Sequence, residues 1–236
     1  MLMIARNQRL LVVGATLGLA LLAWAYLARG GAMTMTQDFW LVLIMWWVMM
    51  AAMMLPSAAP AILLYARVRT SRGETGGIAP PWLFGAGYLI AWLMFSIAAA
   101  GLQLALVGAG WIGAMDLRAS APAMIGAGLF VAGAYQLSPW KNACLSSCRS
   151  PAQFLARHWR PGIWGALRLG LLHGAICIGC CWLLMILLFV GGVMNLAWVA
   201  LLAALVAIEK LLPGGIRVAR IAGAAMIAAG AILVLA

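Results

Sequence analysis

The sequence predicts an all-α membrane protein, a polytopic bundle of about seven transmembrane helices that forms one domain over residues 1–236. Hydrophobic residues make up 67% of the chain and charged residues 8%, far below the roughly 25% charged residues of a soluble domain. Several apolar runs reach the roughly 20 residues that a helix needs to cross about 30 Å of hydrocarbon. The short alternating segments of an outer-membrane barrel are missing, so we expect helices as the spanning elements.

The predicted spans follow seven apolar runs in chain order. The first run begins after Arg6 and Arg9, as in a signal peptide, and residues 23–25 have the small-x-small spacing of a cleavage site. Because this run continues beyond those residues and exceeds a signal-peptide core of about 7 to 15 residues, we expect a retained anchor. The seven runs cover residues 10–28, 39–65, 82–107, 121–137, 167–190, 193–208 and 216–236.

The distribution of basic residues predicts the orientation of these spans. Of the 15 Lys and Arg residues, all but Arg29 and Arg118 fall in segments that face the cytoplasm if the N-terminus is inside. The positive-inside rule therefore predicts a multi-pass protein of the bacterial inner membrane with its N-terminus inside and its C-terminus outside. Because the net charge of +11 follows this topology, we expect membrane lipids, and no nucleic acid, as partners of the basic residues.

The longest connection, residues 138–166, is predicted to be a basic cytoplasmic loop. It contains Pro139, Pro151 and Pro161 among basic and aromatic residues, a composition typical of short helices that lie at the membrane interface. The loop is too short to form a second domain.

Prolines and polar residues inside the runs predict local features of packing. Pro56 and Pro60 each remove a backbone donor, which favours a kink and leaves carbonyls that must face protein or water. Gln103, Gln136 and Asn195 are expected to form hydrogen bonds between helices. Glu209 and Lys210 end the sixth run at its cytoplasmic side, where we expect an ion pair that anchors the helix. Acidic residues are otherwise nearly missing from the runs, which argues against a proton relay.

All five cysteines lie in the basic loop and in the fifth run. On a helix, His173, Cys177 and either Cys180 or Cys181 share one face. His173 and Cys181 are about 12 Å apart along the axis, too far to bind one ion, whereas Cys177 and Cys181 are one turn apart and can chelate together. Sulfur ligands favour copper as Cu(I), with zinc or an iron–sulfur cluster as the weaker candidates. The alternative is that these cysteines are small apolar packing residues.

A methionine-rich stretch in the second run offers further soft ligands. Met49 and Met53 recur at four-residue spacing, as do Met50 and Met54. Counting from the cytoplasmic span edges places Met53 about 18 Å deep and Cys177 about 15 Å deep, both close to the midplane. We therefore predict a thiolate–thioether site built from two helices. The alternative is that methionine is a flexible apolar filler.

A Cys-x-x-x-Cys pair, Cys144 and Cys148, lies in the basic loop and shares one face if that stretch is helical. It can pass on a soft metal, form a redox couple or have no function. Lys141 and Arg149 lie nearby and are expected to lower the thiol pKa. The predicted metal ligands are Cys177, Cys180, Cys181, His173, Met49, Met53, Cys144 and Cys148.

Four motifs together carry a resemblance to a known family. They are Ala52-Met53-Met54-Leu55-Pro56, Tyr135-Gln136-Leu137-Ser138-Pro139-Trp140-Lys141 followed by Cys144 and Cys148, Gly179-Cys180-Cys181-Trp182 with Met185, and Glu209-Lys210. Over most of its length the chain resembles a bacterial domain-of-unknown-function family of predicted metal-binding integral membrane proteins. The resemblance implies a membrane fold that binds metal and a small soluble partner protein, and it implies no particular reaction.

The residues favour a membrane protein that binds a soft metal, copper first, either to handle the ion or to use it as a redox centre in a complex with other membrane subunits. A nucleophile triad, a phosphate loop and paired carboxylates are missing, so hydrolase and ATPase functions lack residues to carry them. Two alternatives stay open at this point. One is a non-enzymatic structural or assembly subunit, and the other is a metal permease.

Overall fold

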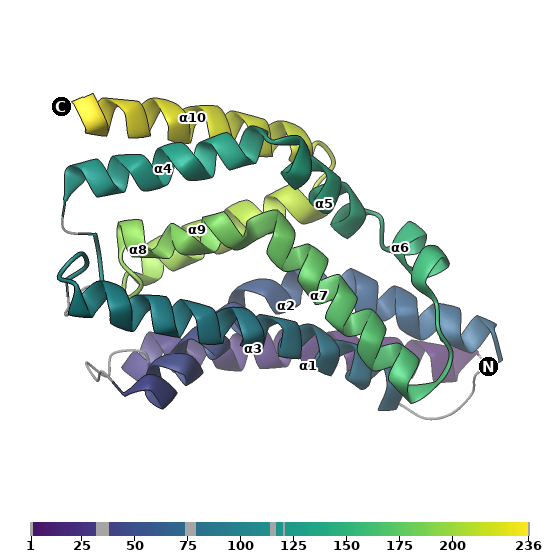
Figure 1. Cartoon of the computed structure of the whole chain (residues 1–236). Helices are drawn as coiled ribbons and strands as arrows, with labels where there is room; N and C mark the ends of the chain where they lie inside the picture. Colours follow the sequence, from purple (N-terminus) through teal and green to yellow (C-terminus); the bar gives the residue numbers. More distant parts are fainter. Residues whose placement is uncertain (1, 32–37, 74–78, 114–116, 120, 236) are drawn as a thin grey trace.

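The computed structural model describes residues 2–31, 38–73, 79–113, 117–119 and 121–235, and most of them are helical (Figure 1). Within these ranges the extended backbone pairing is one isolated bridge between Ile112 and Ala119. The prediction of an all-helical protein is therefore confirmed. In chain order the elements are α1 (Leu2–Tyr26), the π-helical turn η1 (Leu27–Gly31), α2 (Phe39–Ser71), α3 (Ala79–Gly108), α4 (Pro122–Leu137), α5 (Pro139–Arg149), α6 (Pro151–His158), α7 (Gly162–Ile186), α8 (Leu188–Gly191), α9 (Leu196–Leu211) and α10 (Gly215–Leu235).

Four helical stretches in the described residues are long and apolar enough to cross a membrane: Phe39–Ser71, Pro81–Gly108, Gly162–Gly191 and Gly215–Leu235. The other apolar runs also form helices: α1 has 25 residues, whereas α4 and α9 are shorter, with 16 residues each. The α9 helix, for example, has 16 residues, and a helix of that length extends about 24 Å, less than the roughly 30 Å of hydrocarbon. Length and composition thus support four spans, and the count of seven stays a prediction.

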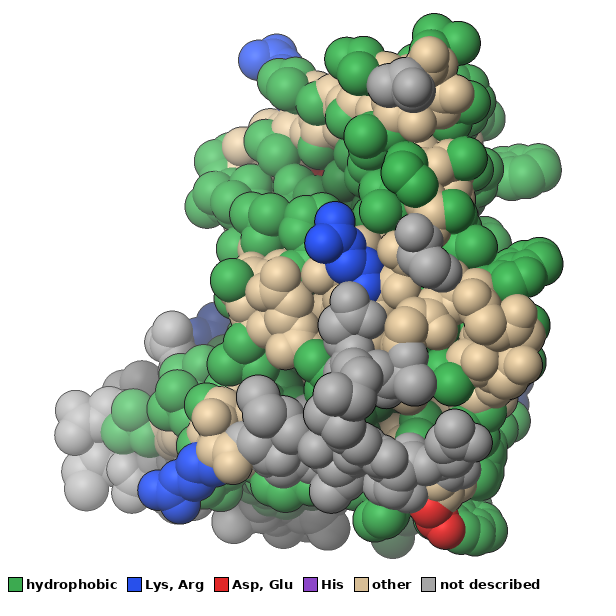
Figure 2. Space-filling model, turned by 90° about the vertical axis from the view of Figure 1, so that its left-hand side faces the viewer, with side chains coloured by type: hydrophobic (Ala, Val, Ile, Leu, Met, Phe, Trp, Pro, Cys, Tyr) green, Lys and Arg blue, Asp and Glu red, His purple; other side chains and the backbone are tan. Residues whose placement is uncertain are grey.

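The helices run back and forth between two ends of the molecule, so that α1 begins at one end and α10 ends at the other (Figure 1). In this view α4 and α10 form one layer, α1, α2 and α3 form another, and α7 and α9 lie between them. The end at which α10 finishes is mainly hydrophobic, with scattered Lys and Arg side chains (Figure 2). The short helices α5 and α6 lie toward the opposite end.

The segment 138–166 forms short helices, as predicted. Each of its three prolines marks a helix start: Pro139 and Pro151 open α5 and α6, and Pro161 is the N-cap of α7. Proline suits these positions because the first N–H groups of a helix have no intrahelical acceptor. The α7 helix begins at Gly162, so the loop is shorter than the sequence indicated.

The two prolines inside α2 do not end the helix, which continues to Ser71. Pro56 lacks the N–H that would bond to the carbonyl four residues earlier, which belongs to Ala52. The indole N–H of Trp24 in α1 donates to this carbonyl oxygen at 3.2 Å. The freed carbonyl therefore faces protein, one of the two predicted alternatives, and its hydrogen bond links α1 to α2.

Two pairs of helices pack closely because glycine faces the neighbouring backbone. In the α3/α7 pair, a Cβ atom at Gly170 would overlap the carbonyl oxygen of Phe84. In the α4/α10 pair, a Cβ atom at Gly230 would lie 2.6 Å from the carbonyl oxygen of Gly126. Small residues at such contacts let apolar helices approach and gain van der Waals packing, which drives helix association in membranes.

Candidate metal-binding site

The Cys177 thiol lies at the centre of a buried group of sulfur atoms. Cys177, Cys180 and Cys181 are 2%, 1% and 1% exposed. The thiols of Cys180 and Cys181 donate to the Cys177 carbonyl oxygen at 3.1 and 3.0 Å, as their spacing of three and four residues on α7 allows. The three side chains therefore occupy one stretch of the helix surface, which faces α2, α3, α5 and α9.

Lys210 of α9 reaches this group of sulfur atoms. Its ammonium nitrogen Nζ lies 2.8 Å from Cys177 Sγ, 3.7 Å from Met54 Sδ and 4.0 Å from Cys181 Sγ. The lysine is buried. A single position, that of Nζ, is thus surrounded by two thiols from α7 and a thioether from α2.

Tyr88 of α3 completes the surroundings of Cys177. Its hydroxyl donates to the Met54 carbonyl oxygen at 3.2 Å and lies 3.0 Å from Cys177 Sγ. Tyr88 is fully buried, so the hydroxyl needs these partners. One side chain therefore fixes α2, α3 and α7 relative to one another at the sulfur group.

A fourth thiol comes from α5. Cys148 lies close enough to Cys177 and Cys180 for hydrogen bonding between sulfur atoms. Close approach of α5 depends on Gly179, because a Cβ atom there would lie 3.2 Å from Cys144 Sγ. The Tyr135 hydroxyl also donates to the Gly179 carbonyl oxygen. The structure thus explains the glycine between the cysteines of α7 as the contact point of α5.

The expected lowering of the Cys144 and Cys148 pKa values is wrong. Burial raises the pKa of the Cys144 thiol, and the neighbouring Cys180 adds to the effect. Hydrogen bonds to the Cys177 and Cys180 sulfurs raise the pKa of Cys148, together with burial. The basic neighbours do not reach these thiols, since Lys141 and Arg149 instead contact Glu209.

The expected ion pair between Glu209 and Lys210 is also wrong. The Glu209 carboxylate accepts from Lys141 Nζ at 2.7 Å and from Gln136 Nε2 at 2.8 Å, and Lys141 also donates to Gln136. Consecutive helical residues point about 100° apart, so Glu209 faces α4 and α5 while Lys210 faces the sulfur atoms.

The prediction of hydrogen bonds between helices is confirmed for Gln136, which bonds from α4 to Glu209 on α9, and for Gln103 of α3, which accepts from the Trp46 indole of α2 at 2.7 Å. Asn195 caps α9 by accepting from the Trp198 N–H group, and it donates to the Gly191 carbonyl oxygen at the end of α8.

The remaining sequence-predicted ligands lie at the edge of this group or away from it. The His173 ring packs among the rings of Phe84, Tyr88 and Phe154, with centroid distances of 5.8, 5.9 and 5.2 Å, and its Nδ1 atom is buried without a hydrogen-bond partner in the described part of the chain. Met53 is buried, but its side chain leaves α2 about 100° around the axis from that of Met54.

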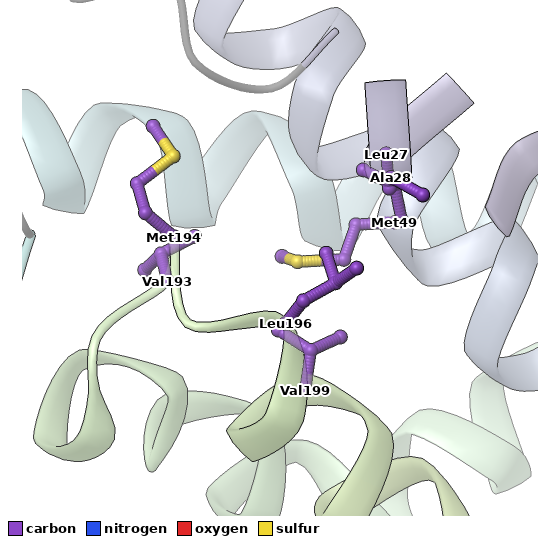
Figure 3. A pocket seen from close by; sticks show the side chains of 7 residues that line it. All are labelled: Leu27, Ala28, Met49, Val193, Met194, Leu196 and Val199. Carbon is purple, nitrogen blue, oxygen red and sulfur yellow. The ribbon is translucent and has the colours of Figure 1, made fainter. Parts of the chain in front are cut away.

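Met49 lies in a separate small pocket of about 60 Å³, close to the start of α9 (Figure 3). Met54 lies five positions after Met49, which corresponds to about 7.5 Å along α2. The residues that line this pocket are Leu27, Ala28, Met49, Val193, Met194, Leu196 and Val199.

Sequence reasoning missed three contributors to the site, Tyr88, Met54 and Lys210. The signal for Lys210 was present, because an ionisable residue inside an apolar run is a functional candidate by default. Tyr88 carried no signal beyond its place in the third run. Among the described residues, no three His, Cys, Asp or Glu side chains stand as a ready metal-binding group, so a bound ion would need Met54 or a small adjustment of the thiols.

Fold and site together define a helical protein with membrane-length helices and a buried thiol–thioether group. The chain belongs to the PpoB2 family, described as copper chaperones, which it matches over residues 43–233. This range includes all the residues placed around Cys177. Comparisons with curated proteins and with solved structures gave no match. Family membership supports a role in copper handling.

Proposed function

We propose that this protein is an integral membrane copper chaperone that carries Cu(I) as its cargo on Cys177, Cys181 and Met54. The observation behind this proposal is the position of Lys210 Nζ, which has these three sulfur atoms within 4.0 Å. A point that already has two thiols and a thioether around it is suited to a soft cation. Family membership supports copper as that cation.

The ligand chemistry favours Cu(I) over the weaker candidates. Thiolate and thioether sulfur are both soft ligands, and thioethers select Cu(I) among the ions that thiolates bind. Structural zinc sites take four tetrahedral ligands from Cys, His and carboxylates, so a thioether in the set counts against zinc. Iron–sulfur clusters are held by cysteine thiolates, usually four.

A chaperone must also release its cargo, and the neighbouring thiols offer a path for this. Cys148 and Cys180 adjoin Cys177, and Cys144 lies half-buried one turn further along α5. Copper can pass between adjacent sulfur ligands without ever losing all of them. In this proposal α5 is the side from which copper enters or leaves, and a small soluble protein is the partner there.

The experiment that tests the site is copper binding to the purified protein in mild detergent, loaded with Cu(I) under reducing conditions. Cys177→Ser should remove bound copper, because it takes away the central sulfur. Cys144→Ser removes a half-buried thiol of the same kind outside the three-sulfur set, and it should leave the copper content unchanged. Copper retained by a folded Cys177→Ser protein would contradict the proposed ligand set.

A second pair of variants decides which methionine acts. Met53 and Met54 are neighbours, both are buried, and Met→Leu nearly conserves volume at either position. Met54→Leu should weaken copper binding, because the Met54 sulfur faces Lys210 and the thiols. Met53→Leu is the matched control. A larger loss of copper binding in Met53→Leu than in Met54→Leu would mean that Met53 is the ligand, as the sequence predicted.

The proposed topology has seven spans in the bacterial inner membrane, with the N-terminus inside and α5 on the cytoplasmic side. Exposed single cysteines at Ser146 on α5 and at Leu235 near the end of α10 test it in intact cells with an impermeant thiol reagent. Leu235→Cys should react and Ser146→Cys should not. Reaction at Ser146→Cys alone would reverse the orientation, and reaction at both would rule out an odd number of spans between these two positions.

A further inference from the structure

We propose that Lys210 makes this site selective for a monovalent metal ion, an inference that rests on the proposed copper site. The ammonium group is buried, and in the described part of the chain its hydrogen-bond partners are the three sulfur atoms given above. A positive charge held this close to the ligands acts on any cation that binds them. Lys210 is therefore a specificity-determining residue and is not itself a ligand.

The charge of Lys210 is not cancelled by the acidic residue beside it. Glu209 directs its carboxylate to Lys141 and Gln136, at 2.7 and 2.8 Å. Because Glu209 is engaged in this way, the ammonium of Lys210 donates to sulfur alone within the described residues. Glu209 and Lys210 are thus adjacent in sequence, but their charged groups contact different partners.

Counting charges shows which ion this arrangement favours. Two thiolates, one ammonium and a monovalent ion sum to zero, whereas a divalent ion leaves one net positive charge. An uncompensated charge is costly in a buried, weakly polar environment, so the neutral combination is favoured. Without Lys210 the count reverses, because two thiolates then neutralise a divalent ion.

Ligand softness alone does not achieve this discrimination. Thiolates bind both Cu(I) and Zn(II), so two cysteines can hold either ion. The nearby ammonium repels a divalent ion about twice as strongly as a monovalent one, because the Coulomb energy is proportional to charge. The flexible four-carbon stem of Lys210 lets the ammonium stay hydrogen-bonded to a thiolate while the metal takes its place among the sulfurs.

The experiment is a competition between Ag(I), a monovalent and redox-inert soft ion, and Zn(II) on the purified full-length protein, with bound metal measured by mass spectrometry. Wild type should prefer Ag(I). In Lys210→Met, which keeps the length of the side chain and removes the charge, the bound Ag(I)/Zn(II) ratio should fall about tenfold or more. Lys210→Gln provides a second neutral variant. The Ag(I)/Zn(II) ratio of either variant tests the inference, provided that the variant elutes as a folded, monodisperse protein.

Two controls separate the charge from other effects. Arg220→Met removes an exposed positive charge on α10 and should leave the ratio unchanged. Lys210→Arg keeps the charge and should retain the preference for Ag(I). An unchanged ratio in a folded neutral variant would overturn this inference while leaving the copper site intact. Wild-type protein that binds neither Cu(I) nor Ag(I) would instead overturn the proposed function itself.

Discussion

The α3/α7 and α4/α10 pairs both pack closely through glycine, but the consequences of this packing differ. In both, glycine lets one backbone approach another, as at Gly170 against Phe84 and at Gly230 against Gly126. The α3/α7 contact lies beside Tyr88 and Cys177, so it sets the distance between groups of the proposed metal site. The glycine contact between α4 and α10 has no chemical group of the site between its helices. Close packing therefore positions the proposed ligands in the α3/α7 pair, whereas in the α4/α10 pair it only holds two helices together.

The two pairs are linked by the buried charge network. Gln136 belongs to α4, Lys141 to α5 and Glu209 to α9, and Lys210 follows Glu209 directly. Glu209 thus holds the α4/α10 pair to the helix that carries Lys210. A change in this network should affect both helix pairs. A change in one glycine contact should affect only the pair that contains it.

The largest effect is expected from Glu209→Gln. The substitution conserves size but leaves the Lys141 ammonium buried without its carboxylate, and removing one partner of a buried pair costs about 3–5 kcal/mol. Thermal unfolding in detergent measures the loss. Arg157→Gln, which removes an exposed charge on α6, is the control and should change stability by about 0.5 kcal/mol or less. Equal effects of the two would mean that the network does not hold the regions together.

The next effect is expected from Gly170→Ala in the α3/α7 pair. The added Cβ atom overlaps the Phe84 carbonyl, so the helices must separate at a cost of about 1–3 kcal/mol. Because Tyr88 and Cys177 lie on these helices, copper binding should fall together with stability. Gly101→Ala on α3 is the matched control, since a Cβ atom there meets nothing within 4 Å. Full copper content in Gly170→Ala would show that the site tolerates movement of α3.

A smaller effect is expected from Gly230→Ala in the α4/α10 pair. The contact with Gly126 is less severe, and alanine gains up to about 1 kcal/mol over glycine in a helix, so the net loss should lie near the low end of the same range. Copper binding should be retained, because no residue of the site lies between these helices. Loss of copper from a folded Gly230→Ala protein would contradict the division of roles between the two pairs.

The sequence predicted the helices well because hydrophobicity marks them directly. It also placed Cys177, Cys180 and Cys181 on one stretch of helix, since that arrangement is local. The partners of Cys177 were harder to predict, because they come from α2, α3, α5 and α9 and depend on how those helices rotate. Met53 and Met54 differ by about 100° around the helix axis but by only about 1.5 Å in depth. An estimate of depth in the membrane therefore could not distinguish them.

The errors about charged residues have the same origin. Glu209 and Lys210 are adjacent, and adjacency suggested an ion pair, yet neighbours on a helix diverge by about 100°. Similarly, Lys141 and Arg149 are close to the loop cysteines in sequence but contact Glu209 in the fold. Only the tertiary arrangement decides which charge compensates which group.

The smallest expected effect concerns the reactivity of Cys144, at the edge of the α3/α7 region. Burial raises the pKa of this thiol, so less thiolate is present at neutral pH than at an ordinary cysteine, and the thiolate is the reactive form. Alkylation of Cys144 in purified protein should be slow at pH 7 and should increase with pH to values above the ordinary cysteine pKa. Ser146→Cys, on the exposed side of the same helix, is the control and should react faster at pH 7 and level off at lower pH. A Cys144 rate that levels off at or below the pH of the control would mean that Lys141 and Arg149 do lower its pKa, and α5 would then sit differently on α7.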